Sequence, residues 1–120
     1  MNELLQSISL LKESEDRIDF KEAKNDFNFN GGSHNDPKKR RHCVLGYVVA
    51  LANEGGGRLV FGMADKYPHQ IIGSNYEKGN LGNLEAAIYD ALRIRVHITE
   101  EFDEDKRVVI FTVPSRPIGR

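Results

Sequence analysis

The sequence predicts an α+β domain in which about three helices pack on a mixed β-sheet. Three observations lead to this fold class. Stretches with helical apolar spacing alternate with short apolar runs, three glycines join a helix to a buried strand, and a hairpin pattern closes the C-terminal part. A chain of 120 residues is large enough for one hydrophobic core, so we expect a single domain over residues 1–120.

The N-terminal part predicts a helix, a strand and a loop. Residues 3–12 suit a helix because Leu4, Ile8 and Leu11 form one apolar stripe. Residues 17–23 suit a strand, with Ile18 and Phe20 on the face opposite Arg17, Asp19 and Lys21. Residues 26–36 are rich in Asn, Gly, Ser and Asp, which is typical of a loop.

The central part predicts a helix followed by a buried strand. Asp36 and Pro37 form a good helix start, and we expect the helix to run to about Asn53. Three glycines at 55–57 end it and allow a tight passage of the backbone. Residues 58–64 hardly alternate in polarity, which indicates a central strand buried on both faces.

The C-terminal part predicts a short strand, a helix and a hairpin. The short strand is expected near residues 69–73, and a helix follows Asn80 with Leu81, Leu84, Ile88 and Ala91 at helical spacing. Residues 93–99 alternate in polarity, as a strand with one solvent-exposed face does. Residues 103–106 then form a hairpin turn into a second strand over 107–113.

The net charge of −1 and a pI near 6.4 argue against a uniformly basic nucleic-acid binder, so any such binding needs a local cluster. The predicted first turns of the central helix carry such a cluster, formed by Lys38, Lys39, Arg40 and Arg41. Cations at a helix N-terminus oppose the helix dipole, whereas a bound phosphate would favour them there. The alternative is a solvated face paired with loop acids such as Asp26 and Asp36.

A second candidate cationic row lies on the predicted strand 93–99. Arg93, Arg95 and His97 share its solvent-exposed face and could follow a phosphate backbone, with Arg107 or Arg116 extending the row. The row could equally protect an edge strand from pairing.

Several function classes find no support in the sequence. No run of about 18 apolar residues indicates a membrane span, and the N-terminal residues lack the pattern of a secretory signal. The single Cys43 cannot form an internal disulfide, which fits a reducing cytoplasm. The glycines at 55–57 lack the Gly-Lys-Ser/Thr of a phosphate loop, and the histidines lack paired zinc-ligand spacing. We therefore expect a cytoplasmic protein without a membrane partner.

Four segments together resemble the AlbA_2 domain shared by Schlafen proteins and bacterial transcriptional regulators. They are Glu13-Ser14, Asp19-Phe20-Lys21, Ala52-Asn53-Glu54-Gly55-Gly56-Gly57 and Phe61-Gly62-Met63-Ala64-Asp65, and the similarity extends to Val113-Pro114-Ser115-Arg116-Pro117. The resemblance implies a domain that binds DNA or RNA and needs no cofactor to do so. It also implies two expectations about assembly: a longer parent protein with a C-terminal ATP-binding or winged-helix region, and a homodimer that completes a binding groove.

The Schlafen branch of this family implies an alternative function, an endoribonuclease that cuts structured RNA such as tRNA. Its metal-binding acids correspond by position to Asp19 and Asp65, with either Glu13 or Glu15 as the first acid. Glu13, Asp19 and Asp65 would then hold Mg²⁺ or Mn²⁺, and Lys21 would neutralise charge on the scissile phosphate. From the residues alone, the alternative is an Asp19–Lys21 pair on a solvated strand face and a turn acid at Asp65.

Overall fold

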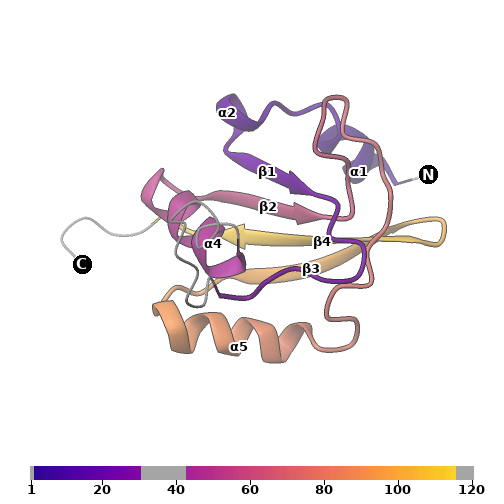
Figure 1. Cartoon of the computed structure of the whole chain (residues 1–120). Helices are drawn as coiled ribbons and strands as arrows, with labels where there is room; N and C mark the ends of the chain where they lie inside the picture. The colour runs from indigo at the N-terminus through magenta and orange to yellow at the C-terminus, as the bar shows by residue number, and fades with distance from the viewer. Residues whose placement is uncertain (1, 31–42, 116–120) are drawn as a thin grey trace.

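The computed structural model describes residues 2–30 and 43–115, apart from the side chains of residues 14 and 15 (Figure 1). The helices and strands of this part are α1 (Glu3–Ile8), α2 (Glu13–Asp16), β1 (Ile18–Lys21), α4 (Val44–Asn53), β2 (Gly57–Phe61), α5 (Leu81–Leu92), β3 (His97–Asp103) and β4 (Lys106–Val113). Within these residues no helix has the length and apolar character that crossing a membrane requires.

The strands form one mixed sheet in the order β1-β2-β4-β3. β1 runs parallel to β2, with Asp19 beside Leu59, whereas β4 pairs antiparallel with both β2 and β3. The predicted α+β class with a mixed sheet is therefore confirmed. The predicted central position of the 58–64 run is also confirmed, because β2 lies between two strands and its Leu59, Val60 and Phe61 are buried.

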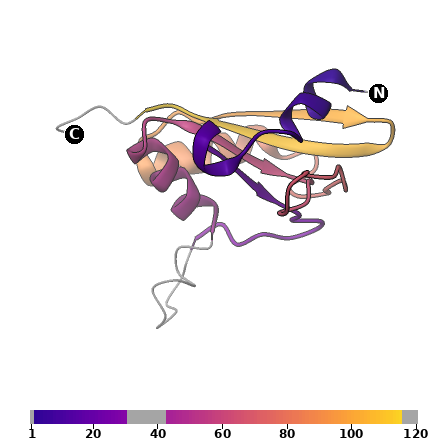
Figure 2. The same ribbon diagram turned by 90° about the horizontal axis from the view of Figure 1, so that it is seen from above.

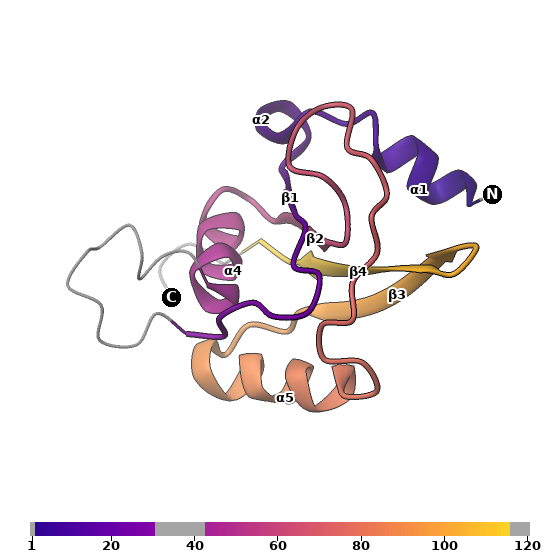
Figure 3. The same cartoon turned by 45° about the vertical axis from the view of Figure 1, so that its right-hand side comes forward.

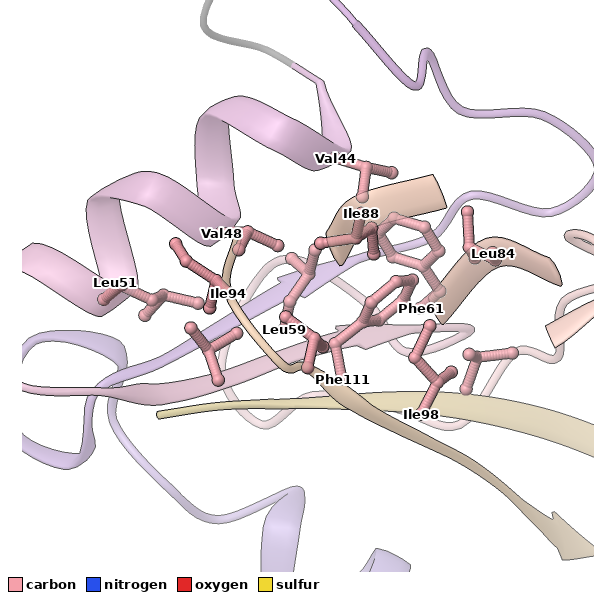
Figure 4. Packing of buried hydrophobic residues seen from close by; sticks show 14 of the residues in the cluster. Val44, Val48, Leu51, Leu59, Phe61, Leu84, Ile88, Ile94, Ile98 and Phe111 are labelled. Atoms are coloured by element: carbon pink, nitrogen blue, oxygen red, sulfur yellow. The ribbon is translucent and has the colours of Figure 1, made fainter. Parts of the chain in front are cut away.

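Each face of the sheet carries its own hydrophobic cluster. α4 and α5 cover one face, where Val48 and Ile88 pack with Phe61 and Phe111 (Figures 1 and 4). On the opposite face, α1 packs against the residues that alternate with these, as seen from above in Figure 2. That cluster contains Leu5, Ile8, Ile18, Phe20, Val60, Met63, Ile71, Val108 and Ile110. The side chains of β1 that point away from α1, Asp19 and Lys21, consequently face the side on which α4 lies.

The glycines at 55–57 end α4 and form a tight turn into β2, as predicted. Gly55 and Gly56 have φ angles of 104° and 94°, a region in which residues with a side chain are strained. A Cβ atom on Gly56 would lie 2.9 Å from the carbonyl oxygen of Val113. Only glycine lets the backbone turn this closely past β4 and enter β2.

The predicted start of the first helix at residue 3 and the predicted end of the second at Asn53 are confirmed, but the other two predicted helix limits in the first half of the chain differ from the structure. α1 ends at Ile8 instead of residue 12, and Leu4 is exposed because Leu5 and Ile8 form the buried face. α4 begins at Val44, since Cys43 is extended and its Sγ accepts a hydrogen bond from the Gly46 N–H at 3.2 Å. The start predicted near residue 37 lies outside the described residues, and the first turn of α4 itself carries no basic residue.

The second half of the chain differs from prediction at three places. Arg93 adopts a left-handed conformation (φ 58°) as the C-cap of α5, so β3 begins at His97 and not at residue 93. The burial alternation nevertheless holds, because Ile94 and Val96 are buried in an extended segment. The strand near 69–73 is reduced to one bridge between Met63 and Ile71, and Ala91 on α5 is exposed. The hairpin turn is confirmed by pairing of Asp103 with Lys106.

Candidate functional site

The parallel pairing of β1 and β2 brings one candidate site together. Lys21, the last residue of β1, pairs with Phe61, and the chain after β2 returns Asp65 to it. The Lys21 Nζ lies 3.6 Å from Asp65 Oδ1. Asp19 lies two residues earlier on the same face of β1. We call Glu13, Asp19 and Asp65, together with Lys21, the acidic cluster.

Glu13 joins the acidic cluster from α2, the short helix that precedes β1. Partial burial, a side-chain hydrogen bond with Asp19 and the negative charges of Asp19 and Asp65 raise the pKa of Glu13 to about 7. Lys21 opposes this rise but does not cancel it. Glu13 therefore changes its protonation state near neutral pH, as a group that exchanges protons in catalysis would.

Lys21 remains charged in this setting. Burial alone would lower the pKa of Lys21, but electrostatic interactions with Tyr47 and Asp65, a hydrogen bond with Tyr47 and the negative charge of Asp19 outweigh it and raise the pKa. The Lys21 Nζ also lies 5.0 Å from the centre of the Tyr47 ring. Tyr47 on α4 is thus a further member of this site, which the sequence analysis did not identify.

The acidic cluster does not form a ready metal site in this conformation. In the part of the chain that the structure describes, no three His, Cys, Asp or Glu side chains are arranged so that they could hold a metal ion. Lys21 instead supplies the positive charge closest to Asp65. The side chain of Glu15, the other candidate for the first acid, lies outside the described residues.

Arg93 and Arg95 form a second candidate site at the C-terminal end of α5. Their guanidinium carbons lie 5.5 Å and 4.6 Å from the centre of the Tyr89 ring, so one tyrosine holds both side chains. Both arginines are exposed, and neither forms an ion pair within residues 2–30 and 43–115. We call these two residues the arginine pair. Tyr89 precedes Arg93 by one helical turn, a spacing from which its contact could have been predicted.

The other cations that the sequence proposed as phosphate ligands differ in exposure and in their ion pairs. Arg107 does not extend the arginine pair, because it is only 3% exposed and its Nε donates to Glu100 at 2.6 Å. His97 is exposed beside Glu85, with Nδ1 and Oε2 3.8 Å apart. Lys38, Lys39, Arg40, Arg41 and Arg116 lie outside the described residues.

Solved structures of two bacterial proteins share this fold. The N-terminal domain of a RecG-related protein from Nitrosomonas europaea aligns with a TM-score of 0.56 and 20% identity over 96% of this chain and 72% of that one. The DIP2311 protein of Corynebacterium diphtheriae aligns with a TM-score of 0.58 and 20% identity over 88% of this chain. The present chain spans only 22% of the length of DIP2311. At this level of identity the likeness shows the fold alone.

The sequence itself identifies the family. The family model described as Schlafen, AlbA_2 matches residues 14–119, which is nearly the whole chain. The chain therefore belongs to the Schlafen AlbA_2 family, as the four sequence segments indicated. Comparison with curated proteins gives no match.

Proposed function

We propose that this chain is the nucleic-acid-binding domain of a cytoplasmic transcriptional regulator, and that it contacts phosphates through clustered cations. Membership of the Schlafen AlbA_2 family supports a nucleic-acid-related role. A structural neighbour named as related to the DNA helicase RecG supports it too, and suggests a larger parent protein with an ATP-binding or winged-helix region. Phosphates would be bound by the arginine pair and by Lys38, Lys39, Arg40 and Arg41.

The arginine pair is the observation that carries this proposal. Both guanidinium groups already lie over the Tyr89 ring without a ligand, and this contact restricts their motion and so reduces the entropy lost on binding. A guanidinium that stacks on a ring keeps the N–H donors at its edge free, and these match the oxygens of a phosphate. Because no acid of the described residues pairs with either arginine, both charges are available to a polyanion.

Substitution of the arginine pair tests the proposal. We expect the double variant Arg93→Gln/Arg95→Gln to bind an oligonucleotide of about 20 nucleotides roughly tenfold more weakly at moderate salt, measured by fluorescence anisotropy. Tyr89→Leu keeps both charges but removes their support, so a smaller loss is expected. The exposed Lys12→Gln serves as the matched control. Equal affinity of the double variant and this control would contradict the proposal.

A homodimer is part of the proposal, and the structure restricts how it would form. The N–H of Ile98 on edge strand β3 donates to Glu85 Oε2 at 2.7 Å, and the Asn2 amide donates to the Phe102 carbonyl oxygen at 3.1 Å. These contacts occupy backbone groups that a second sheet would need. We therefore expect a dimer, measured by light scattering, to use another surface.

The acidic cluster supports a second candidate function, that of an endoribonuclease. The specific observation is the raised pKa of Glu13 beside two further carboxylates and a charged lysine. Glu13 could exchange a proton near neutral pH, and Lys21 could neutralise charge that develops on a phosphate. In this conformation the carboxylates of Glu13, Asp19 and Asp65 are not arranged so that all three could hold one Mg²⁺ or Mn²⁺ ion.

Cleavage of tRNA in the presence of Mn²⁺ tests the second candidate. Asp65→Ala removes a carboxylate that is 61% exposed, and it should abolish cleavage, whereas the hairpin variant Glu104→Gln should retain it. Cleavage that survives Asp65→Ala would exclude this site. Absence of cleavage by the unaltered protein would exclude the function.

A further inference from the structure

A positively charged hollow of about 560 Å³ lies apart from both candidate sites. It forms where three segments meet: the chain after β1, the 72–78 segment before α5, and the β3–β4 hairpin. Figure 3 shows the second of these segments passing the hairpin on its way to α5. The exposed residues around the hollow are Lys24, Asn25, Asn75, Lys78, Phe102, Asp105 and Lys106, and we call this site the lysine pocket.

Buried Arg107 fixes the floor of the lysine pocket. Its Nη1 donates to the carbonyl oxygens of Ser74 at 3.1 Å and Tyr76 at 2.9 Å, and the Ser74 N–H donates back to the Arg107 carbonyl oxygen at 2.8 Å. The Asn75 N–H donates to the Lys24 carbonyl oxygen at 2.7 Å, which ties the chain after β1 to the same floor. All three segments are therefore held in place without a ligand, so little ordering is needed on binding.

The charges of the pocket are unbalanced. Lys24, Lys78 and Lys106 make no ion pair within the described part of the chain, and Asp105 is the acid beside them. The charge of Arg107 is paired with Glu100, but its buried Nη2 has no hydrogen-bond acceptor among residues 2–30 and 43–115. Three lysines against one acid favour an anion, and a phosphate is the anion that flexible lysines commonly bind.

The other side chains around the pocket indicate which class of phosphate-containing ligand fits it. Phe102 lines the pocket and is 48% exposed, so the face of its ring is accessible to a ligand there. The Asn75 Nδ2 lies 3.5 Å from the Asn25 Oδ1 in the same pocket, and these two amides offer both donors and acceptors. An aromatic face for stacking, amides for polar edges and lysines for phosphate together suit a nucleotide.

We propose that the lysine pocket binds one nucleotide unit of a single strand, with its phosphate on Lys78 and Lys106 and its base against Phe102. This inference rests on the proposed nucleic-acid binding and specifies the ligand as single-stranded. A free nucleotide would offer the same chemistry, so the experiment separates the two sources.

Binding is measured for a labelled single-stranded oligonucleotide, for adenosine 5′-monophosphate and for inorganic phosphate. We expect Lys78→Gln/Lys106→Gln to weaken binding of the strand about tenfold. Phe102→Leu should weaken binding of the strand and of the nucleotide severalfold but leave inorganic phosphate unchanged. The Lys12→Gln control should bind all three as the unaltered protein does. All substituted side chains are exposed, and thermal unfolding of each variant verifies that it folds.

The possible results separate this inference from the proposed function. Suppose that the protein binds the single strand, that the arginine-pair variant binds it more weakly, and that both pocket variants bind it with unchanged affinity. The pocket proposal is then overturned and the proposed function stands. If only the free nucleotide binds, and does so through the two lysines and Phe102, the pocket is a site for free nucleotides, and both the single-strand inference and the proposed function are overturned. If neither ligand binds, both are overturned.

Discussion

Replacement of Glu13 by glutamine removes one ionisable carboxyl from the acidic cluster and keeps a side chain that can hydrogen-bond with Asp19. In the folded protein the pKa of Glu13 is about 7, against an ordinary value of 4.5. The folded state therefore holds this proton more tightly than the unfolded state. It follows that the free energy of unfolding decreases as pH rises from about 4.5 to 7 and stays reduced above pH 7.

The magnitude follows from the same two values. The full difference between 4.5 and about 7 corresponds to at most about 3.4 kcal/mol. Glu13 is partly exposed, and solvent screening reduces this to roughly 1–2 kcal/mol. Glutamine carries no charge at any of these pH values, so Glu13→Gln should stabilise the protein by this amount at pH 8 and have little effect at pH 4.5.

Urea denaturation at pH 4.5, 6 and 8 measures this difference for the unaltered protein, Glu13→Gln and the exposed control Glu104→Gln. The stability gain of Glu13→Gln should grow with pH, whereas the control should show no such trend. A gain that is the same at all three pH values, or a loss at pH 8, would refute the electrostatic coupling within the acidic cluster.

Three further predictions concern stability and titration. Arg107→Met should lower the free energy of unfolding by roughly 2–4 kcal/mol in urea denaturation, because the Ser74 and Tyr76 carbonyl oxygens and Glu100 lose their donor; an unchanged midpoint would show that Arg107 does not hold the 72–76 segment. Gly56→Ala should cost about 1–3 kcal/mol because of its φ of 94° and the nearby Val113 oxygen, whereas the control Gly82→Ala, in helix α5 and with open space at its Cβ, should stabilise the protein by up to about 1 kcal/mol. Burial, with the charges of Glu77 and Asp26, raises the pKa of Tyr76 to about 12, so an absorbance titration should show a late-ionising tyrosine that Tyr76→Phe removes.

The elements with strong local patterns were predictable from the sequence. Apolar and polar residues alternate around Ile18 and Phe20, and this pattern predicts a strand with one face in the core. Residues 59–61 of β2 are apolar without interruption, and this pattern predicts a strand in the middle of a sheet that is covered on both faces. The glycines at 55–57 predicted the turn between α4 and β2 because few other residues permit it. The family segments likewise placed Asp19, Lys21 and Asp65 together, as the ion pair of Lys21 with Asp65 shows.

The features that sequence reasoning missed depend on contacts between distant segments. The alternation at 93–99 is real in burial, but the left-handed Arg93 keeps its first residues out of the sheet. Arg107 looked like a surface cation, because nothing local shows that Glu100 and two carbonyl oxygens satisfy it in the interior. The lysine pocket joins residues from three parts of the chain, so no local pattern reports it.

The salt dependence of nucleic-acid binding tests the central claim most directly. If clustered cations bind phosphates, the logarithm of the association constant should fall linearly with the logarithm of salt concentration, by roughly 0.7–0.9 per phosphate contacted. Alanine at positions 38–41 and glutamine at Arg93 and Arg95 should each flatten this slope. A slope near zero for the unaltered protein, or one that neither set of substitutions changes, would contradict the account.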